Sequence, residues 1–176
     1  MRSCAAAVLS LSLLVSSRCG FAQELQPTEY QIKAAFIFNF AKFVEWPAAA
    51  LPKPTSSIVI GVLGENPFRD NLEKIIRNKT VDDHPLTIRQ CHSPAEATNC
   101  QILFISNSES ARVAQILKAL EGNSILTVGE MERFNEAGGM ISFVFEGTKI
   151  RFKINNEAAT RAGLKISSKL LSYALR

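Results

Sequence analysis

The stretch SIVIGVL at residues 57–63 decides the fold, because a short run of β-branched and other apolar residues is typical of a strand buried on both faces. A second such run, QILFIS, occupies residues 101–106, and a third, SILTV, occupies residues 124–128. Amphipathic patterns at residues 68–78 and 108–120 separate these runs and predict helices. Strands that alternate with helices indicate a parallel sheet covered by helices on both faces.

Local signals refine the boundaries of these elements. The segment LTIRQC at residues 86–91 alternates like a further strand. Ser108 is the expected N-cap of the helix at residues 108–120, and Gly122 stands where a left-handed C-terminal cap prefers glycine. A short helix is expected at residues 130–135.

The C-terminal part changes character and predicts a hairpin. Residues 140–145 (MISFVF) and 149–154 (KIRFKI) are separated by a turn that contains Gly147. In the second arm, apolar residues alternate with Lys and Arg, which is common protection for an edge strand. A final helical segment is interrupted at Gly163. We therefore predict an α/β fold: a three-layer sandwich with a mostly parallel sheet of about six strands, an antiparallel C-terminal hairpin, and helices on both faces.

The segment YQIKAAFIFNFAKFVEWP at residues 30–47 predicts a helix that is apolar almost all the way round. Lys33 lies inside the apolar arc, whereas Phe38 falls among Lys42 and Glu45 on the side that ought to face water. A short domain rarely needs so much apolar surface on one helix unless both sides are covered. The cover is either the domain's own core or another chain.

The first 22 residues predict a secretory signal that is cleaved before Gln23. Arg2 supplies the positive start, and residues 4–15 form an apolar run of the usual length. No later stretch approaches the roughly 20 apolar residues that a membrane-spanning helix needs. We therefore expect a single exported domain at residues 23–176.

Composition and motifs exclude several classes of function. Loss of Arg2 and Arg18 with the signal lowers the formal charge from +4 to +2, which is too weak to indicate nucleic-acid binding. The glycines within residues 61–64 make neither GxGxxG nor a GKS or GKT motif. His84 and His92 are the only histidines, and they match no zinc spacing. No nucleophile has a neighbouring base, so we expect no enzyme, no metal and no cofactor.

Cys91 and Cys100 are the two cysteines that remain after removal of the signal. An even pair in an oxidising compartment predicts one disulfide. It would close a loop of about ten residues and stabilise the fold by roughly 2–3 kcal/mol. Two roles stay open, a plain structural bridge and a redox-responsive switch.

Two stretches together resemble the YfiR family of periplasmic proteins. One is the segment at residues 30–47, and the other is GGMISFVFEGTKIRFKINNEAATRAGLKISSKLLSYA at residues 138–174. The strand at residues 101–106 also fits. The resemblance covers essentially the whole mature chain.

The resemblance implies a non-catalytic regulator with an α/β sandwich fold that commonly dimerises. It also implies inhibition of a membrane-bound diguanylate cyclase, through binding of the cyclase's periplasmic sensor domain, with a lowered level of cyclic-di-GMP. An outer-membrane lipoprotein can sequester such a repressor, and relatives also occur beside sensor kinases. Better-known members of the family carry a cysteine on the first strand and a second pair near the hairpin. This chain departs from that pattern, because residues 58–60 and 138–145 contain no cysteine. Cys100 matches a family position, and Cys91 is a different partner for it.

The leading hypothesis is that the protein acts through a protein–protein contact. We expect the contact face to include an aromatic anchor with a charged rim, as interfaces prefer. The expected residues are Phe38, Ala41, Glu45 and Trp46.

The alternative hypothesis is a small-molecule-sensing module that acts with a sensor kinase or an outer-membrane receptor. Ligands of α/β sheets usually bind at the carboxyl ends of the parallel strands. The residues expected to border that crevice are Gly64, Asn66, Phe68, Ser106 and Ser108.

Overall fold

The computed structural model describes residues 27–53 and 55–175. The predicted signal at residues 1–22 and its cleavage site therefore lie outside the described residues.

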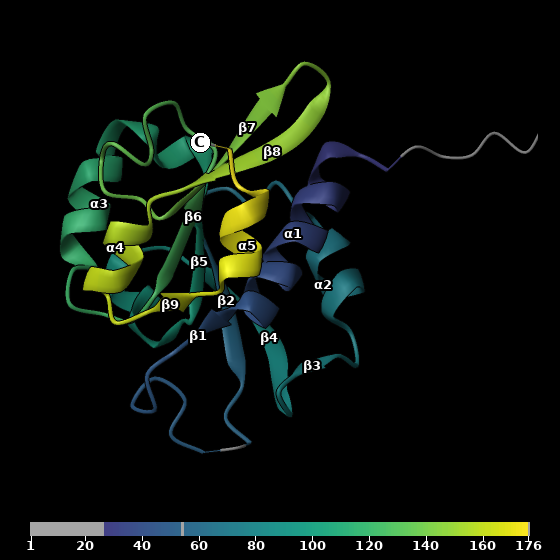
Figure 1. Cartoon of the computed structure of the whole chain (residues 1–176), viewed down its shortest axis with the longest axis vertical. Helices are drawn as coiled ribbons and strands as arrows, with labels where there is room; N and C mark the ends of the chain where they lie inside the picture. Colours follow the sequence, from purple (N-terminus) through teal and green to yellow (C-terminus); the bar gives the residue numbers. More distant parts are fainter. Residues whose placement is uncertain (1–26, 54, 176) are drawn as a thin grey trace, which may run out of the picture.

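One seven-stranded sheet forms the centre of the molecule, with the strand order β3-β4-β2-β5-β6-β7-β8 (Figure 1). The neighbours from β4 to β7 pair in parallel, whereas β8 and the short β3 are antiparallel to their neighbours. The strands are β2 (Ile58–Leu63), β3 (Thr80–Val81), β4 (His84–Cys91), β5 (Ile102–Ile105), β6 (Leu126–Gly129), β7 (Ile141–Glu146) and β8 (Lys149–Ile154). The predicted, mostly parallel sheet with a C-terminal hairpin is confirmed, and the very short β3 is the additional strand.

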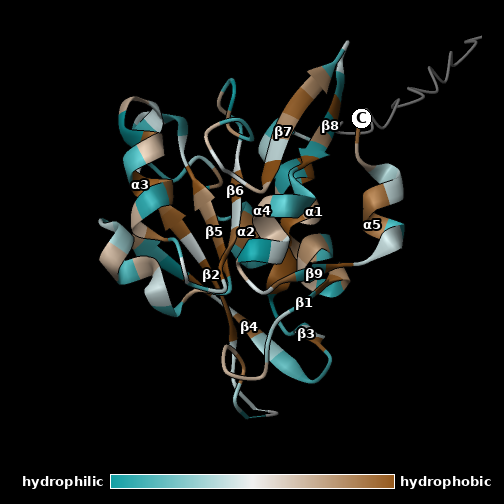
Figure 2. Cartoon of the chain, turned by 60° about the vertical axis from the view of Figure 1, so that its left-hand side comes forward, coloured by the Kyte–Doolittle hydropathy of each residue, from teal (hydrophilic) through white to brown (hydrophobic). Residues whose placement is uncertain are grey.

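Two apolar clusters lie on opposite faces of this sheet and make the fold three-layered. Alternate residues of β5 point to different clusters: Ile102 and Phe104 to the first, Leu103 and Ile105 to the second. Figure 2 shows apolar residues concentrated along β2 and β5. The first cluster is covered by α1 (Glu29–Phe43), α2 (Asn71–Ile76), α4 (Asn156–Arg161) and α5 (Ser168–Tyr173); the second is covered by η1 (Pro94–Asn99) and α3 (Val113–Ala119).

The first helix is shorter than the sequence pattern predicts. It begins after Thr28, whose hydroxyl accepts a hydrogen bond from the Gln31 amide while the Gln31 side chain accepts one from the Thr28 amide. It ends at Phe43 instead of continuing to Pro47. The chain turns extended at Val44 because β1 (Val44–Glu45) pairs with β9 (Lys165–Ile166).

Two local predictions about helices are wrong, because the chain forms tighter turns than an α-helix at both places. Ser106, not Ser108, caps the segment after β5, and this segment begins as the 3-10 helix η2 (Asn107–Arg112) before α3. Residues 130–135 form turns and no helix, with Arg133 at a positive φ of 61°. Gly122 has the predicted left-handed conformation after α3, with φ of 81°.

Candidate functional site

The helix α1 is buried on one side and leaves a strip of its surface uncovered. Ala34, Ile37 and Phe40 are fully buried against the sheet, whereas Asn39 and Lys42 are exposed. Two half-buried rings, Phe38 and Phe43, flank this exposed strip. We call the strip and its flanking rings the outer face of α1.

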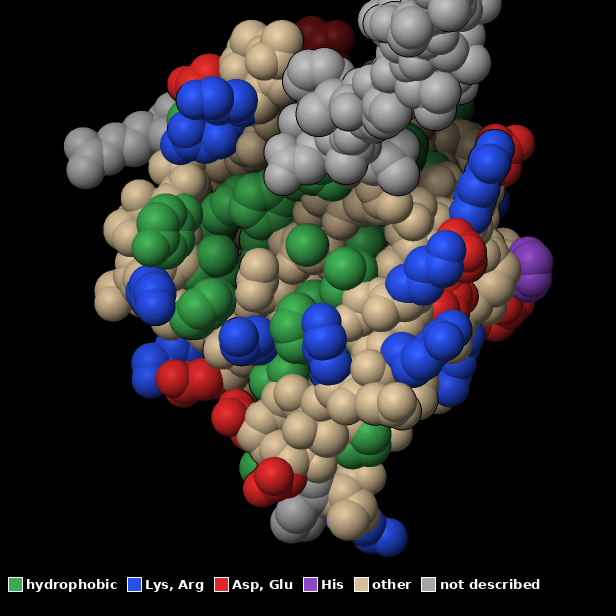
Figure 3. All heavy atoms as spheres, turned by 90° about the vertical axis from the view of Figure 1, so that its right-hand side faces the viewer, with side chains coloured by type: hydrophobic (Ala, Val, Ile, Leu, Met, Phe, Trp, Pro, Cys, Tyr) green, Lys and Arg blue, Asp and Glu red, His purple; other side chains and the backbone are tan. Residues whose placement is uncertain are grey.

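Lysine side chains surround the outer face of α1. The Phe38 ring has the ammonium groups of Lys79 and Lys42 at 4.6 and 5.6 Å from its centre, and Lys169 of α5 lies 5.4 Å from the centre of Phe43. Figure 3 shows this side of the molecule as a hollow floored by hydrophobic side chains and bordered by basic ones. Apolar surface inside a charged rim is the usual arrangement of a protein interface.

The structure separates the residues predicted to bind a partner. Ala41 is 1% exposed and lies on the buried side of α1, so the prediction that it belongs to the contact face is corrected. Trp46 is half-buried and its Nε1 donates to the Gln101 carbonyl at 3.1 Å, while the exposed Glu45 carboxylate pairs with Lys165 at 3.0 Å. Ala41, Glu45 and Trp46 border a cavity of about 260 Å³ that Phe38 does not line.

The predicted ligand crevice is closed largely by the protein itself. Phe68 is fully buried between Tyr30 and Phe104, with ring centres at 5.5 and 4.7 Å, so its role as a ligand contact is corrected. The Ser108 hydroxyl accepts from the Glu65 amide at 3.0 Å and lies directly against Gly64. These groups occupy the space in which a ligand was expected.

Two other predicted crevice residues satisfy backbone groups. Asn66 accepts from the Phe68 amide through its side-chain oxygen at 2.9 Å. Ser106 is buried, and its hydroxyl accepts from the Ser108 amide. Both residues therefore shape turns at the carboxyl ends of β2 and β5.

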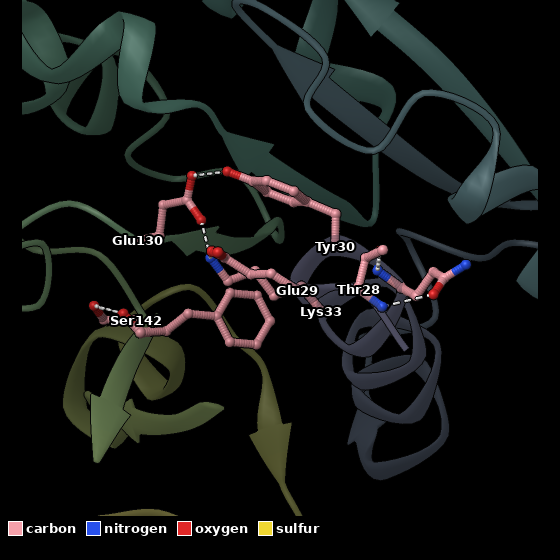
Figure 4. Close-up of polar contacts among 8 residues, drawn as sticks. Thr28, Glu29, Tyr30, Lys33, Glu130 and Ser142 are labelled. Carbon is pink, nitrogen blue, oxygen red and sulfur yellow. Dashed lines mark hydrogen bonds and ion pairs between the residues drawn. The ribbon is translucent and has the colours of Figure 1, made fainter. Parts of the chain in front are cut away.

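A cluster of charges that the sequence analysis missed lies beside the same end of the sheet. Figure 4 shows Lys33 of α1 reaching two carboxylates, Glu29 one turn earlier and Glu130 directly after β6. The side chains of Lys33 and Glu130 are 3% and 6% exposed. Tyr30 also donates to Glu130, at 3.0 Å. The only signal in the sequence was a lysine inside an apolar arc.

Burial together with the Glu130 carboxylate raises the pKa of Tyr30 to about 12. The phenol is therefore neutral at physiological pH and serves as a hydrogen-bond donor. The cluster lines a cavity of about 620 Å³ that extends to the β7–β8 hairpin. We call it the Lys33 cavity.

Cys91 and Cys100 are both buried and occur as free thiols in the structure, without the predicted disulfide. A Cβ added at Gly61 would lie 2.8 Å from the Cys100 sulfur and 3.3 Å from the Cys91 sulfur, so both sulfurs pack against the same backbone. Burial raises the pKa of the Cys91 thiol and raises that of Cys100 to about 12. The disulfide stays a prediction.

These thiols predict how the stability of the reduced protein depends on pH. The folded state holds the thiol protons more tightly than the unfolded chain, in which cysteine has a pKa of roughly 8.5. The contribution of the buried thiols to the free energy of unfolding is therefore complete below the pKa of the unfolded chain. It is lost as the pH rises toward the folded pKa of about 12. Urea unfolding of the reduced protein should show stability falling between about pH 8 and 10.

The Cys100→Ser variant is the control for this measurement. Its stability should depend less on pH over the same range, because it lacks the most strongly shifted thiol. Protein purified without reductant should resemble this variant if the predicted disulfide forms, and reduction should restore the slope. Equal slopes for the reduced protein and the variant would contradict the assigned burial of Cys100.

Potential metal ligands and membrane-spanning helices were sought in the described part of the chain. Within residues 27–53 and 55–175, no three His, Cys, Asp or Glu side chains come together as a metal site. In the same part of the chain, no helix combines the length and apolar character needed to cross a bilayer.

These features define a three-layer α/β protein with an exposed, lysine-bordered helix face and a charged cavity. The chain belongs to the YfiR/HmsC-like family, whose model matches residues 30–175. Proteins of this family are periplasmic, non-catalytic regulators, and membership suggests a role in diguanylate cyclase signalling.

The fold is also similar to a crystal structure of a conserved domain protein from Vibrio cholerae. The TM-score is 0.55 at 14% sequence identity, and the match covers 84% of this chain. The chain matches only 59% of that protein's length. At this identity the similarity concerns the fold alone.

Proposed function

We propose that this protein is a periplasmic inhibitor that binds the periplasmic sensor domain of a membrane-bound diguanylate cyclase through the outer face of α1, and so lowers cyclic-di-GMP. The observation that carries the proposal is the pair of half-buried rings, Phe38 and Phe43, bordered by lysines on one helix. Aromatic residues are enriched in protein interfaces, where a few buried anchors supply most of the binding energy.

Glu45 and Trp46 extend the proposed contact face at the C-terminal end of α1. Glu45 is exposed, and part of the Trp46 ring is accessible beside the cavity of about 260 Å³. The surrounding lysines favour a partner surface with carboxylates that face Lys42 and Lys79. A sensor kinase is the alternative target, and no nucleic acid or cofactor is involved.

The same face suits two further proposed contacts. A homodimer that pairs the outer faces of α1 would cover the rings of Phe38 and Phe43. An outer-membrane lipoprotein that competes for this face would release the cyclase. Both contacts would protect the same apolar surface from water.

Replacing Phe38 with alanine should weaken the inhibition while leaving the fold intact. Loss of an aromatic anchor costs roughly 2 kcal/mol or more in binding, which is over tenfold in affinity. A half-buried ring contributes less to stability than a fully buried one, so we expect the free energy of unfolding to fall by about 1 kcal/mol. In cells that lack the native protein, the variant should fail to lower cyclic-di-GMP to the level set by the native chain.

A charge-reversal pair provides the matched control. Lys79→Glu alters the rim of the proposed face, whereas Lys118→Glu makes the same charge change on α3, across the sheet. Only the first should raise cyclic-di-GMP. If removing the whole protein leaves cyclic-di-GMP unchanged, or if both reversals act equally, the proposal is wrong.

A further inference from the structure

The Lys33 cavity is built like a binding site. Its volume of about 620 Å³ lies within the range of small-ligand pockets, roughly 300–1,000 Å³. Its wall combines buried charges with aromatic rings on α1 and on the β7–β8 hairpin. The residues that line it include Glu29, Tyr30, Lys33, Glu130, Phe143 and Phe145.

The charges at this wall do not cancel. The single ammonium of Lys33 contacts two carboxylates, Glu29 and Glu130, and the Tyr30 phenol is neutral. Over the whole lining, the four carboxylates of Glu29, Glu130, Glu132 and Glu136 outnumber the three cations of Lys33, Arg133 and Lys153, so one negative charge remains uncompensated. Among the described residues, Glu130 uses both oxygens, one for Tyr30 and one for Lys33, whereas Glu29 uses one oxygen and its side chain is 41% exposed. The free acceptor is thus the second oxygen of Glu29.

Aromatic rings surround the Lys33 ammonium, which contacts this Glu29 carboxylate. The Lys33 ammonium lies 4.8 Å from the centre of Tyr30, 5.8 Å from that of Phe143 and 5.5 Å from that of Phe145. Phe145 is 59% exposed, although large apolar side chains usually seek burial. Aromatic faces beside a carboxylate are the arrangement by which proteins bind ammonium and guanidinium groups.

We infer that the Lys33 cavity binds a small organic monocation, a primary amine or an alkylguanidinium, with its charged head on Glu29 and its carbon body against Tyr30 and Phe145. Because Arg133 and Lys153 also line the cavity, the net excess is a single carboxylate, which matches a monocation better than a longer polycation. The ligand would neutralise the excess carboxylate and cover the exposed ring. This inference goes beyond the proposed inhibition and does not rest on it.

Calorimetric titration of the full mature chain with butylguanidinium and butylammonium chloride tests the inference. We expect saturable binding of both cations at millimolar concentration or below, weaker binding of spermidine, and none of butyrate or butanol. Glu29→Gln should weaken cation binding at least tenfold, or about 1.4 kcal/mol. Phe145→Ala should also weaken it.

The Glu29→Gln variant keeps the buried Lys33–Glu130 pair, so it should fold. Glu73→Gln removes an equal charge from the exposed surface of α2 and should leave binding unchanged. Absence of binding by either cation, equal binding of butanol, or equal affinity in the Glu29→Gln and native proteins would overturn the inference. None of these outcomes bears on cyclic-di-GMP levels, so the two proposals fail separately.

Discussion

Replacing Lys33 with methionine is expected to lower the free energy of unfolding by about 3–5 kcal/mol, because it leaves the buried Glu130 carboxylate without its counter-charge. The methionine fills a similar volume, so the loss reflects the charge rather than a cavity. Urea unfolding followed by circular dichroism measures it. The cost is large because the Lys33 and Glu130 side chains are 3% and 6% exposed, so a lone charge there has little contact with water.

A second substitution separates this charge effect from packing. In the double variant Lys33→Met/Glu130→Gln the unpaired carboxylate is gone, and the amide oxygen can still accept the hydrogen bond from Tyr30. Much of the lost stability should return. If the double variant is no more stable than Lys33→Met, the cost arises from packing and the assigned ion pair contributes little.

Replacing Phe40 with alanine is expected to cost about 3–5 kcal/mol, because its ring is fully buried where α1 meets the hairpin. Its centre lies 6.1, 5.8 and 5.2 Å from the centres of Phe36, Phe143 and Phe152. Removal leaves a cavity and also loses these ring contacts. Chemical denaturation measures the change.

The matched control is Phe43→Ala, three residues later on the same helix. Phe43 is half-buried and belongs to the outer face of α1, so its loss should cost clearly less stability than that of Phe40. Equal costs would contradict the assignment of one ring to the core and the other to the surface.

Short-range patterns determined most of the architecture. The buried runs that became β2, β5 and β6 are recognisable because both of their faces are covered and their residues are apolar throughout. The hairpin and the left-handed conformation of Gly122 were predictable from the residues that turns prefer, because turns depend on the backbone preferences of single residues. The family was recognisable from the segments at residues 30–47 and 138–174.

Long-range pairing explains where the local patterns failed. The apolar pattern at residues 30–47 continues through Val44, yet the helix stops there because Val44 pairs with Ile166, far along the chain. Likewise, Phe68 was expected at a crevice but fills the space between Tyr30 and Phe104. No local propensity reports such contacts, because they depend on residues that meet only after folding.

The sequence by itself determined the alternation of strands and helices, the C-terminal hairpin and the apolar first helix, since each depends on the periodicity of neighbouring residues. Only the tertiary structure decided which rings of that helix stay accessible, and only it joined Lys33 to Glu130 across 97 positions of the chain. Ion pairing and exposure depend on which side chains contact one another in the folded protein, and these contacts form only when the sheet and helices pack together.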